Sequence, residues 1–200
     1  MLPQNVSVVP PDLDAFVLHW QKIGKVGLMP TLRGFLDAPP FKLQSEVAIV
    51  DVVSPTDMRF RLFGTGLSSL SGHDLTGSDV LSNFHPTARA AAASNAWAAV
   101  TLPCGYFVRR DLRHGLFKTH AVGIGLPLLH EQSGRVCLVV FSSTVDKSVD
   151  AGGGDGSPVV YNVSLMRWIN IGAGTLDTGT QGGHQRRESR HIPDARLKLT

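Results

Sequence analysis

The sequence predicts an α+β domain built on a five-stranded antiparallel sheet, with helices packed on one face and a further helix at the N-terminus. Three observations lead to this fold class. Residues 47–63 contain two adjacent strand patterns, residues 87–100 are rich in alanine and helical, and residues 104–145 contain three strand patterns separated by short turns. Two strands, a helical segment and three more strands indicate one sheet with helices on it.

An amphipathic helix is expected first. Its apolar positions follow the i, i+3, i+4, i+7 spacing of a helix face and are Leu13, Phe16, Val17, Trp20 and Ile23. Asp12 is the expected cap, and the glycines at 24 and 27 end the helix. Three prolines between residues 30 and 40 indicate an extended connector.

The first two strands are expected to form a hairpin. Residues 47–53 are rich in valine and apolar except for Asp51, which is typical of a buried strand, and the turn 54–57 leads to a partner strand at 58–63. On the partner strand Met58, Phe60 and Leu62 should share one face, with Arg59 and Arg61 on the other.

Glycines divide the following stretch, residues 64–80, into short helical turns. There glycine is expected to supply positive φ, and Thr65, Asp74 or Ser78 to cap a turn. Several short turns seldom pack as closely as one long helix, so this stretch is expected to form one wall of a cavity over the sheet.

A longer helix should follow, started by Pro86, running through 87–100 and ending at Leu102-Pro103. Strands are then expected at 104–110, 116–128 and 135–145. The turns between them have the lengths of antiparallel hairpins.

The composition changes after residue 147. A Gly-rich segment indicates a flexible linker, an apolar segment follows it, and the end of the chain is polar and basic, which is typical of disorder. The expected organisation is an N-terminal helix and connector (1–45), a sheet-and-helix core (46–147), a linker (148–158), an apolar segment that packs back (159–174) and a basic tail (175–200).

The excess positive charge lies in the tail. Residues 181–200 carry five basic and two acidic side chains, which is the whole formal net charge of +3, and the rest of the chain is balanced. A nucleic-acid-binding fold carries its basic residues on the fold itself, so the pattern argues against nucleic acid. The tail is interpreted as a solvated end, with an acidic partner or a membrane surface as alternative contacts.

No signal-peptide pattern is seen at the N-terminus, and no apolar run approaches the roughly 20 residues that span a bilayer. Cys104 and Cys137 are far apart and are expected to be free thiols in a reducing compartment. A cytoplasmic protein without membrane contact is therefore the expectation.

Several short motifs stand at fixed places in this order of elements. They are the helix with Trp20, the connector with Pro30, Arg59-Phe60-Arg61-Leu62-Phe63-Gly64-Thr65, Gly72-His73-Asp74-Leu75-Thr76-Gly77, Gly125-Leu126-Pro127-Leu128 and Trp168-Ile169-Asn170-Ile171-Gly172-Ala173-Gly174. Together they resemble a PAS domain, and more narrowly a family of short bacterial single-domain PAS-like proteins. The resemblance covers roughly residues 13–147, with a weaker match near 165–174.

The resemblance implies a sensory or regulatory module in signalling that binds a small ligand, a protein partner or both. It leaves the ligand and any cofactor unknown, because PAS domains hold haem, flavins, carboxylates, lipids or nothing. The Asn-Cys-Arg-Phe-Leu-Gln motif of flavin photoreceptors is absent. No kinase, cyclase or helix-turn-helix segment is attached, so an output would pass through a signalling protein partner.

The cavity is expected between the helix-covered sheet face and the broken stretch. Its predicted lining is Phe60, Leu62, Leu67, Leu70, Leu81, Phe84, Ala88, Ala92, Phe107, His120, Val122 and Phe141. Such a mostly apolar lining favours an apolar or amphipathic small molecule. The N-terminal helix has two open interpretations, because its apolar stripe either pairs across a homodimer or covers the outer face of the sheet.

Three other sequence features have simpler interpretations than a binding site. Gly64-Thr65-Gly66 begins like a dinucleotide loop, but Ser69 stands where the third glycine is required. His73, His85, His120, His184 and His191 lack second ligands at metal-binding spacing, so no metal or haem ligand is assigned. The glycines at 152–156 are interpreted as linker and not as a calcium-binding repeat.

No motif joins a nucleophile to a base, so catalysis is not expected. Two alternatives to a ligand-binding sensor stay open. One is a ligand-free protein-interaction domain with a filled core, and the other is a small enzyme on the same fold that uses Cys104 with a distant histidine.

Overall fold

The computed structural model describes residues 10–114, 117–149 and 159–175. Its helices, including the 3₁₀ turns η1 and η2, are α1 (Pro11–Lys22), α2 (Leu32–Asp37), η1 (Gln44–Glu46), α3 (Thr65–Ser71), η2 (Val80–Asn83) and α4 (Pro86–Thr101). Its strands are β1 (Lys25–Val26), β2 (Met29–Pro30), β3 (Val47–Ser54), β4 (Asp57–Phe63), β5 (Gly105–His114), β6 (Phe117–His130), β7 (Arg135–Val149) and β8 (Val159–Ile169).

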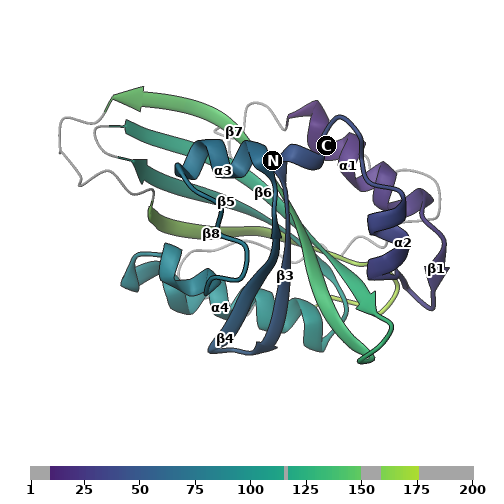
Figure 1. Cartoon of the computed structure of the whole chain (residues 1–200). Coiled ribbons are helices and arrows are strands. Elements are labelled where there is room, and N and C mark those ends of the chain that lie inside the picture. The colour runs from purple at the N-terminus through teal and green to yellow at the C-terminus, as the bar shows by residue number, and fades with distance from the viewer. Residues whose placement is uncertain (1–9, 115–116, 150–158, 176–200) are drawn as a thin grey trace, which may run out of the picture.

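The described residues form one large sheet in the strand order β4-β3-β7-β6-β5-β8, in which every neighbouring pair is antiparallel. The predicted α+β class with an antiparallel sheet is therefore confirmed. Figure 1 shows α1 and α2 against one side of this sheet and α4 against the other. In the described part of the chain, no helix is long and apolar enough to cross a membrane.

The predicted number of five strands is wrong, because the main sheet has six. The additional strand is β8, which pairs with β5 from Gly105↔Ile169 to Arg113↔Val159. Its segment was expected only to pack back onto the domain. Without β8, strand β5 would be an edge with unpaired backbone groups, so the apolar, valine-containing segment completes the ladder there.

Both faces of the sheet are covered, which corrects the expectation of helices on one face. We call the side under α1 and α2 the α1 face; its buried sheet residues include Ile49, Ile124 and Phe141. We call the other side the α4 face; it buries Val50 and Leu138 against alanines of α4. Most strands therefore contribute side chains to both of two separate hydrophobic clusters, whereas the clustered residues of β6 all belong to the α1 face.

The apolar stripe of α1 packs on the α1 face. Leu13, Phe16, Val17 and Trp20 are buried, and Phe16 stacks on Phe141 of β7 with ring centroids 5.1 Å apart. The indole Nε1 of Trp20 donates a hydrogen bond of 3.1 Å to the carbonyl oxygen of Pro127. The stripe is thus part of the intrachain core.

The start of α1 and the connector differ from the expectation. The residue before α1 is Pro10, which gives no side-chain cap, so Asp12 lies within the first turn instead of capping the helix. There its carboxylate complements the positive end of the helix dipole. The connector is not fully extended, since Thr31 caps α2 by accepting a hydrogen bond of 2.9 Å from the amide of Gly34.

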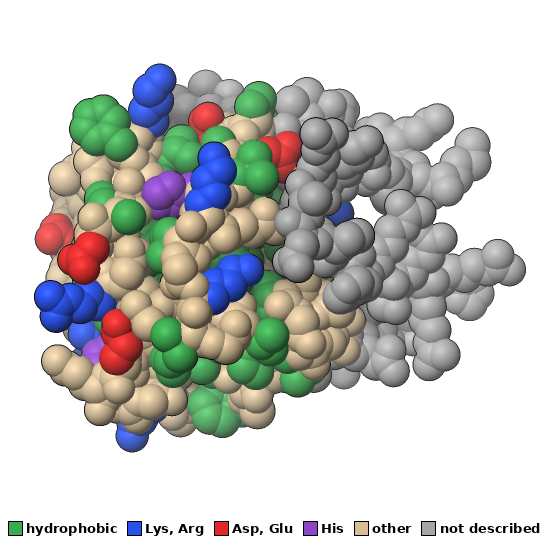
Figure 2. Space-filling model, turned by 90° about the vertical axis from the view of Figure 1, so that its right-hand side faces the viewer, with side chains coloured by type: hydrophobic (Ala, Val, Ile, Leu, Met, Phe, Trp, Pro, Cys, Tyr) green, Lys and Arg blue, Asp and Glu red, His purple; other side chains and the backbone are tan. Residues whose placement is uncertain are grey.

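The molecular side that carries α1 and α2 shows hydrophobic side chains scattered among charged ones in its described part (Figure 2). The large exposed apolar residues within 10–46 are Leu18, Val26, Leu28, Leu36 and Phe41. A homodimer through α1 would have to use this outer side, because the inner stripe is buried against the sheet. Self-association stays a prediction.

Replacing Trp20 with glutamate should destabilise the fold by at least about 3 kcal/mol, because it removes a large core ring and introduces a carboxylate into an apolar site. Leu18→Glu is the matched control, since Leu18 lies on the same helix with 42% of its surface exposed. Urea denaturation measures the difference. A Trp20→Glu protein that kept its stability and only lost oligomer mass in sedimentation would contradict the intrachain packing.

Candidate functional site

A cavity of about 180 Å³ lies on the α4 face of the sheet. Its floor is made of side chains from β3 to β8, and its cover comes from α3, η2 and α4. The lining residues Leu70 and Thr144 are exposed, so the cavity reaches the surface. Most of its wall is apolar.

The cover consists of short turns because glycines and aspartates end each one. Gly72 follows α3 with φ +80°, and Gly77 has φ +83°, which is the left-handed region that favours glycine. Asp74 accepts hydrogen bonds from the amide and hydroxyl of Thr76, and Asp79 caps η2 by accepting from the amide of Leu81 at 3.0 Å. Thr65, Asp74 and Ser78 were expected to cap a helical turn. The structure instead shows no side-chain cap on α3 and assigns the cap of η2 to Asp79.

The cover is tied to the edge strand β4. The amide of Phe60 donates to the carbonyl of Ser78 at 3.1 Å, and the amide of Gly77 donates to the carbonyl of Phe60 at 2.6 Å. Gly64, at the end of β4, has φ −64° and so does not need glycine for positive φ. It needs glycine for space, since a Cβ there would lie 2.8 Å from the carbonyl oxygen of Val47.

Six of the twelve predicted lining residues line this cavity. They are Phe60, Leu67, Leu70, Leu81, Phe84 and Ala92. Ala88 is buried in α4 but does not reach the cavity, and His120 does not reach it either. The remaining four, Leu62, Phe107, Val122 and Phe141, belong to the hydrophobic cluster of the α1 face.

A bulge explains the misplacement of Leu62. Ile49 pairs with Leu62 while the next residue, Val50, pairs with Phe60, so Arg61 is an extra residue in β4. Phe60 therefore turns toward the cavity and Leu62 toward α1, although strict alternation places them on one face. Phe107, Val122 and Phe141 were assigned to the wrong face of the sheet. Both sides of their strands are buried, so alternation along the strand does not show which side faces the cavity.

The site also contains polar residues that the sequence analysis did not single out. On β5, Tyr106 and Arg110 face the cavity. They lie across β6, where Gly123 and Gly125 leave the sheet face bare of side chains. A Cβ at Gly123 would be 2.9 Å from Cζ of Arg110, and one at Gly125 would be 2.7 Å from the phenol oxygen of Tyr106. The two glycines in alternate positions were the available sequence signal.

The guanidinium of Arg110 crosses β6 and donates from Nη1 to Oγ of Ser142 on β7 at 3.0 Å. Burial lowers the pKa of Arg110, and the neighbouring Tyr106 opposes this effect. Burial likewise raises the pKa of the Tyr106 phenol, while the positive charge of Arg110 opposes that shift. Among the described residues, no carboxylate forms an ion pair with Arg110, and no hydrogen-bond partner is found for the Tyr106 hydroxyl.

The histidines do not form a metal site in the described residues, where no group of three His, Cys, Asp or Glu side chains is suitably placed. His120 contacts Asp111 with Nδ1 at 2.7 Å from Oδ1, and Asn162 donates to the other carboxylate oxygen at 3.1 Å. His73 is exposed, and Nδ1 of His85 lies 2.8 Å from Oγ1 of Thr87 at the start of α4. His184, His191 and the glycines at 152–156 lie outside the described residues.

The loop at Gly64-Thr65-Gly66 does not resemble a dinucleotide site in its surroundings. It follows β4, which among the described strands of the large sheet pairs with the antiparallel strand β3 alone. The parallel βαβ unit that presents a phosphate to a helix N-terminus is absent from this part of the described chain.

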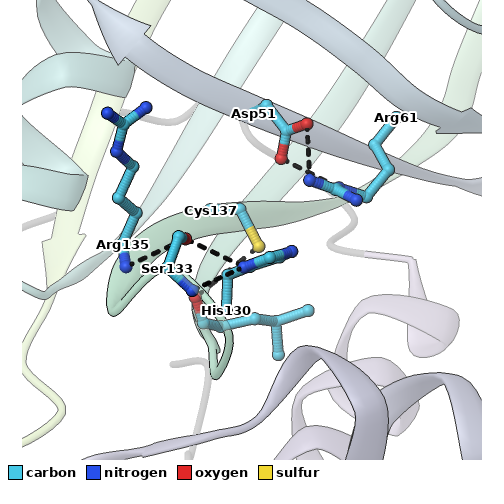
Figure 3. A network of polar contacts seen from close by, with 7 residues as sticks. Asp51, Arg61, His130, Ser133, Arg135 and Cys137 are labelled. Atoms are coloured by element: carbon cyan, nitrogen blue, oxygen red, sulfur yellow. Dashed lines mark hydrogen bonds and ion pairs between the residues drawn. The ribbon is translucent and has the colours of Figure 1, made fainter.

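Neither cysteine is placed as a nucleophile. Figure 3 shows Cys137 beside the β6–β7 turn, where its thiol donates to the carbonyl of Leu128 at 3.6 Å and Nδ1 of His130 is engaged by Ser133 at 2.8 Å. Burial raises the pKa of Cys137 to about 12 and that of Cys104 to about 11. Both thiols therefore stay protonated at neutral pH.

Comparisons of this chain with protein-family models, with curated proteins and with solved structures found no match.

Both thiols should resist modification in the folded protein. At pH 7.5 an aromatic disulfide reagent should react about a hundredfold more slowly with the native chain than with the chain unfolded in guanidinium, because a pKa raised by two pH units lowers the thiolate fraction a hundredfold. The unfolded chain, which should release two equivalents, is the control. Rapid release of one equivalent from the native protein would contradict the buried placement.

The glycine track can be tested by a double-mutant cycle. Gly123→Ala should cost about 1–3 kcal/mol of unfolding free energy, because the new methyl group overlaps the guanidinium of Arg110. In an Arg110→Ala background the same change should cost little, which gives a coupling of about 1 kcal/mol or more in urea denaturation. Gly125→Ala is the control, since its methyl group meets Tyr106 and not Arg110, so its coupling to Arg110→Ala should be clearly smaller. Additive behaviour of Gly123→Ala would rule out the crossing.

Proposed function

We propose that the protein is a PAS-like sensory or regulatory module that binds a small molecule in the cavity of the α4 face. The observation that carries the proposal is the cavity itself, which lies between a sheet face and a cover of short turns. The order of the five strands β4-β3-β7-β6-β5 supports the PAS-like interpretation, since the first strand lies between the second and the last of the five. A helical segment separates the hairpin β3–β4 from the three later strands.

The size of the cavity limits the ligand. Its volume of about 180 Å³ is close to the roughly 150 Å³ of an engineered protein cavity that binds benzene. Sites for drug-sized molecules are about 300–1,000 Å³, which makes a haem or a flavin a poor fit here. The ligand we propose has one ring or a short chain, with a mostly apolar body.

The proposed response is a change in the cover, followed by binding to a protein partner. Leu67 and Leu70 of α3 and Leu81 of η2 are lining residues, so an occupant contacts the cover directly. A ligand that binds one arrangement of the cover more tightly shifts the population toward it. In this proposal the protein is not an enzyme, and its free, buried cysteines fit a reducing, cytoplasmic location.

Ala92→Trp tests whether the cavity is a binding space. Ala92 lines the cavity, so an indole there should occupy it, leave the fold intact and abolish binding of toluene followed by amide chemical shifts. Ala91→Trp is the matched control, because Ala91 is the exposed neighbour in α4 and its replacement should leave binding unchanged. If the site is instead filled core, Ala92→Trp should lose about 1–3 kcal/mol or more from overpacking.

Native mass spectrometry and an absorbance spectrum of the purified wild type complete this test, since a retained ligand appears as added mass or colour. Strong destabilisation by Ala92→Trp, together with a wild type that carries no ligand and binds no toluene, would favour the ligand-free interaction domain.

A further inference from the structure

The cationic side chain of Arg110, on the α4 face, is held differently from that of Arg61. On the opposite side, Arg61 is paired by two contacts of 2.9 Å with the carboxylate of Asp51 (Figure 3). Arg110 is half-buried, yet the hydrogen-bond partner of its guanidinium among the described residues is the neutral hydroxyl of Ser142. A guanidinium stays charged in proteins, so its transfer from water to this wall carries a cost that a serine hydroxyl offsets only in part.

The cavity contains one acidic side chain among its described lining residues, and that acid does not neutralise Arg110. Glu46 comes from η1, and a Cβ at Gly66 of α3 would approach its carboxylate. Its Oε1 accepts a hydrogen bond from Ser45 at 3.5 Å, and no ion pair joins it to Arg110. The positive charge of Arg110 is therefore uncompensated within the described part of the chain.

The backbone is shaped to keep this charge where it is. Because Gly123 has no Cβ, the guanidinium can lie across β6. Gly125 leaves space for the ring of Tyr106 in the same way. The two side chains lie over alternate positions of one strand, close enough that each affects the pKa of the other. Glycine within a strand weakens it, so this arrangement has a cost in stability that packing alone does not explain.

We propose that Arg110 binds the carboxylate of a small aromatic or short-chain acid, with Tyr106 and Ser142 as neighbouring donors. The apolar body of the acid lies against Val108 and Val140. A planar carboxylate matches the fork of a guanidinium, and one cation in a mostly apolar wall suits a single negative charge better than a phosphate dianion. This assignment rests on the proposed function, because it requires the cavity to hold a ligand.

Three ring compounds of nearly equal size test the assignment by titration calorimetry. Benzoate is the anion, benzamide is its neutral counterpart and benzylamine is the cation. Wild type should bind benzoate roughly tenfold or more tightly than benzamide, because a hydrogen bond to a charged group is stronger than a neutral one, and benzylamine most weakly. Arg110→Met should remove the preference for benzoate while benzamide binding persists.

Arg109→Met is the matched control, because Arg109 is the neighbouring residue of β5 and its ion-pair partner is Asp111 at 3.8 Å. It should keep the wild-type order of affinities. Tyr106→Phe, which removes only a hydroxyl, should weaken benzoate more than benzamide and provides a second variant if Arg110→Met does not fold.

The outcomes separate the two proposals. Equal binding of benzoate and benzamide by wild type, or an unchanged preference in Arg110→Met, would overturn the carboxylate site and leave the cavity function standing. Binding of none of the three, with toluene also unbound, would overturn both.

Discussion

Every strand of the large sheet has to supply side chains to two buried faces, and the rest of the structure depends on how differently those faces are covered. On the α1 face an amphipathic helix places large rings against the strands, as in the stack of Phe16 on Phe141. On the α4 face the cover is an alanine-rich helix together with short turns. The small side chains and interrupted helices of the α4 face leave a cavity over the sheet, whereas the large rings of the α1 face pack directly against the strands.

This division assigns stability and function to different sides of one sheet. The α1 face combines stacked aromatic rings with a buried hydrogen bond from Trp20, which are the contacts that make a core costly to disturb. The α4 face carries the features that lower stability, which are a cavity, two glycines inside β6 and a half-buried guanidinium without a carboxylate partner among the described residues. Such features persist when the surrounding structure supplies enough stability to hold them.

The order of elements was predictable because its signals are local. The spacing of apolar residues in α1, the turn between β3 and β4 and the alanines of α4 each act within a few residues. What the sequence did not reveal depends on contacts between distant segments. Pairing of β8 with β5 joins residues far apart in the sequence, such as Gly105 and Ile169, and the bulge at Arg61 changes which face Leu62 occupies. The face of the sheet was predicted wrongly for Phe107 and Phe141, because alternation of side chains identifies the buried face only when the other side is polar.

For the same reason, the apolar residues of the candidate site could be predicted from the sequence in part, and its polar residues could not. Its apolar cover followed from the broken stretch after β4, since glycines at positive φ mark turns in any context. Its polar residues were not singled out because an arginine in a strand normally indicates a solvent-facing side. Only the pairing of β5 with β6, which sets Val108 opposite Gly123, shows that Arg110 has a bare path across the neighbouring strand.

The same geometry suggests how an occupied cavity would be sensed at the surface. The cover is fastened to the edge strand β4 by backbone hydrogen bonds at Phe60, and Phe60 itself lines the cavity. An occupant that presses on Leu81 therefore acts on a segment that also contacts the edge strand β4. Edge strands and short turns are the elements that rearrange at low cost, whereas the α1 face is fixed by its aromatic packing. In the proposed mode of action the partner would read the cover and the β4 edge, and the opposite side of the sheet would serve as the rigid support.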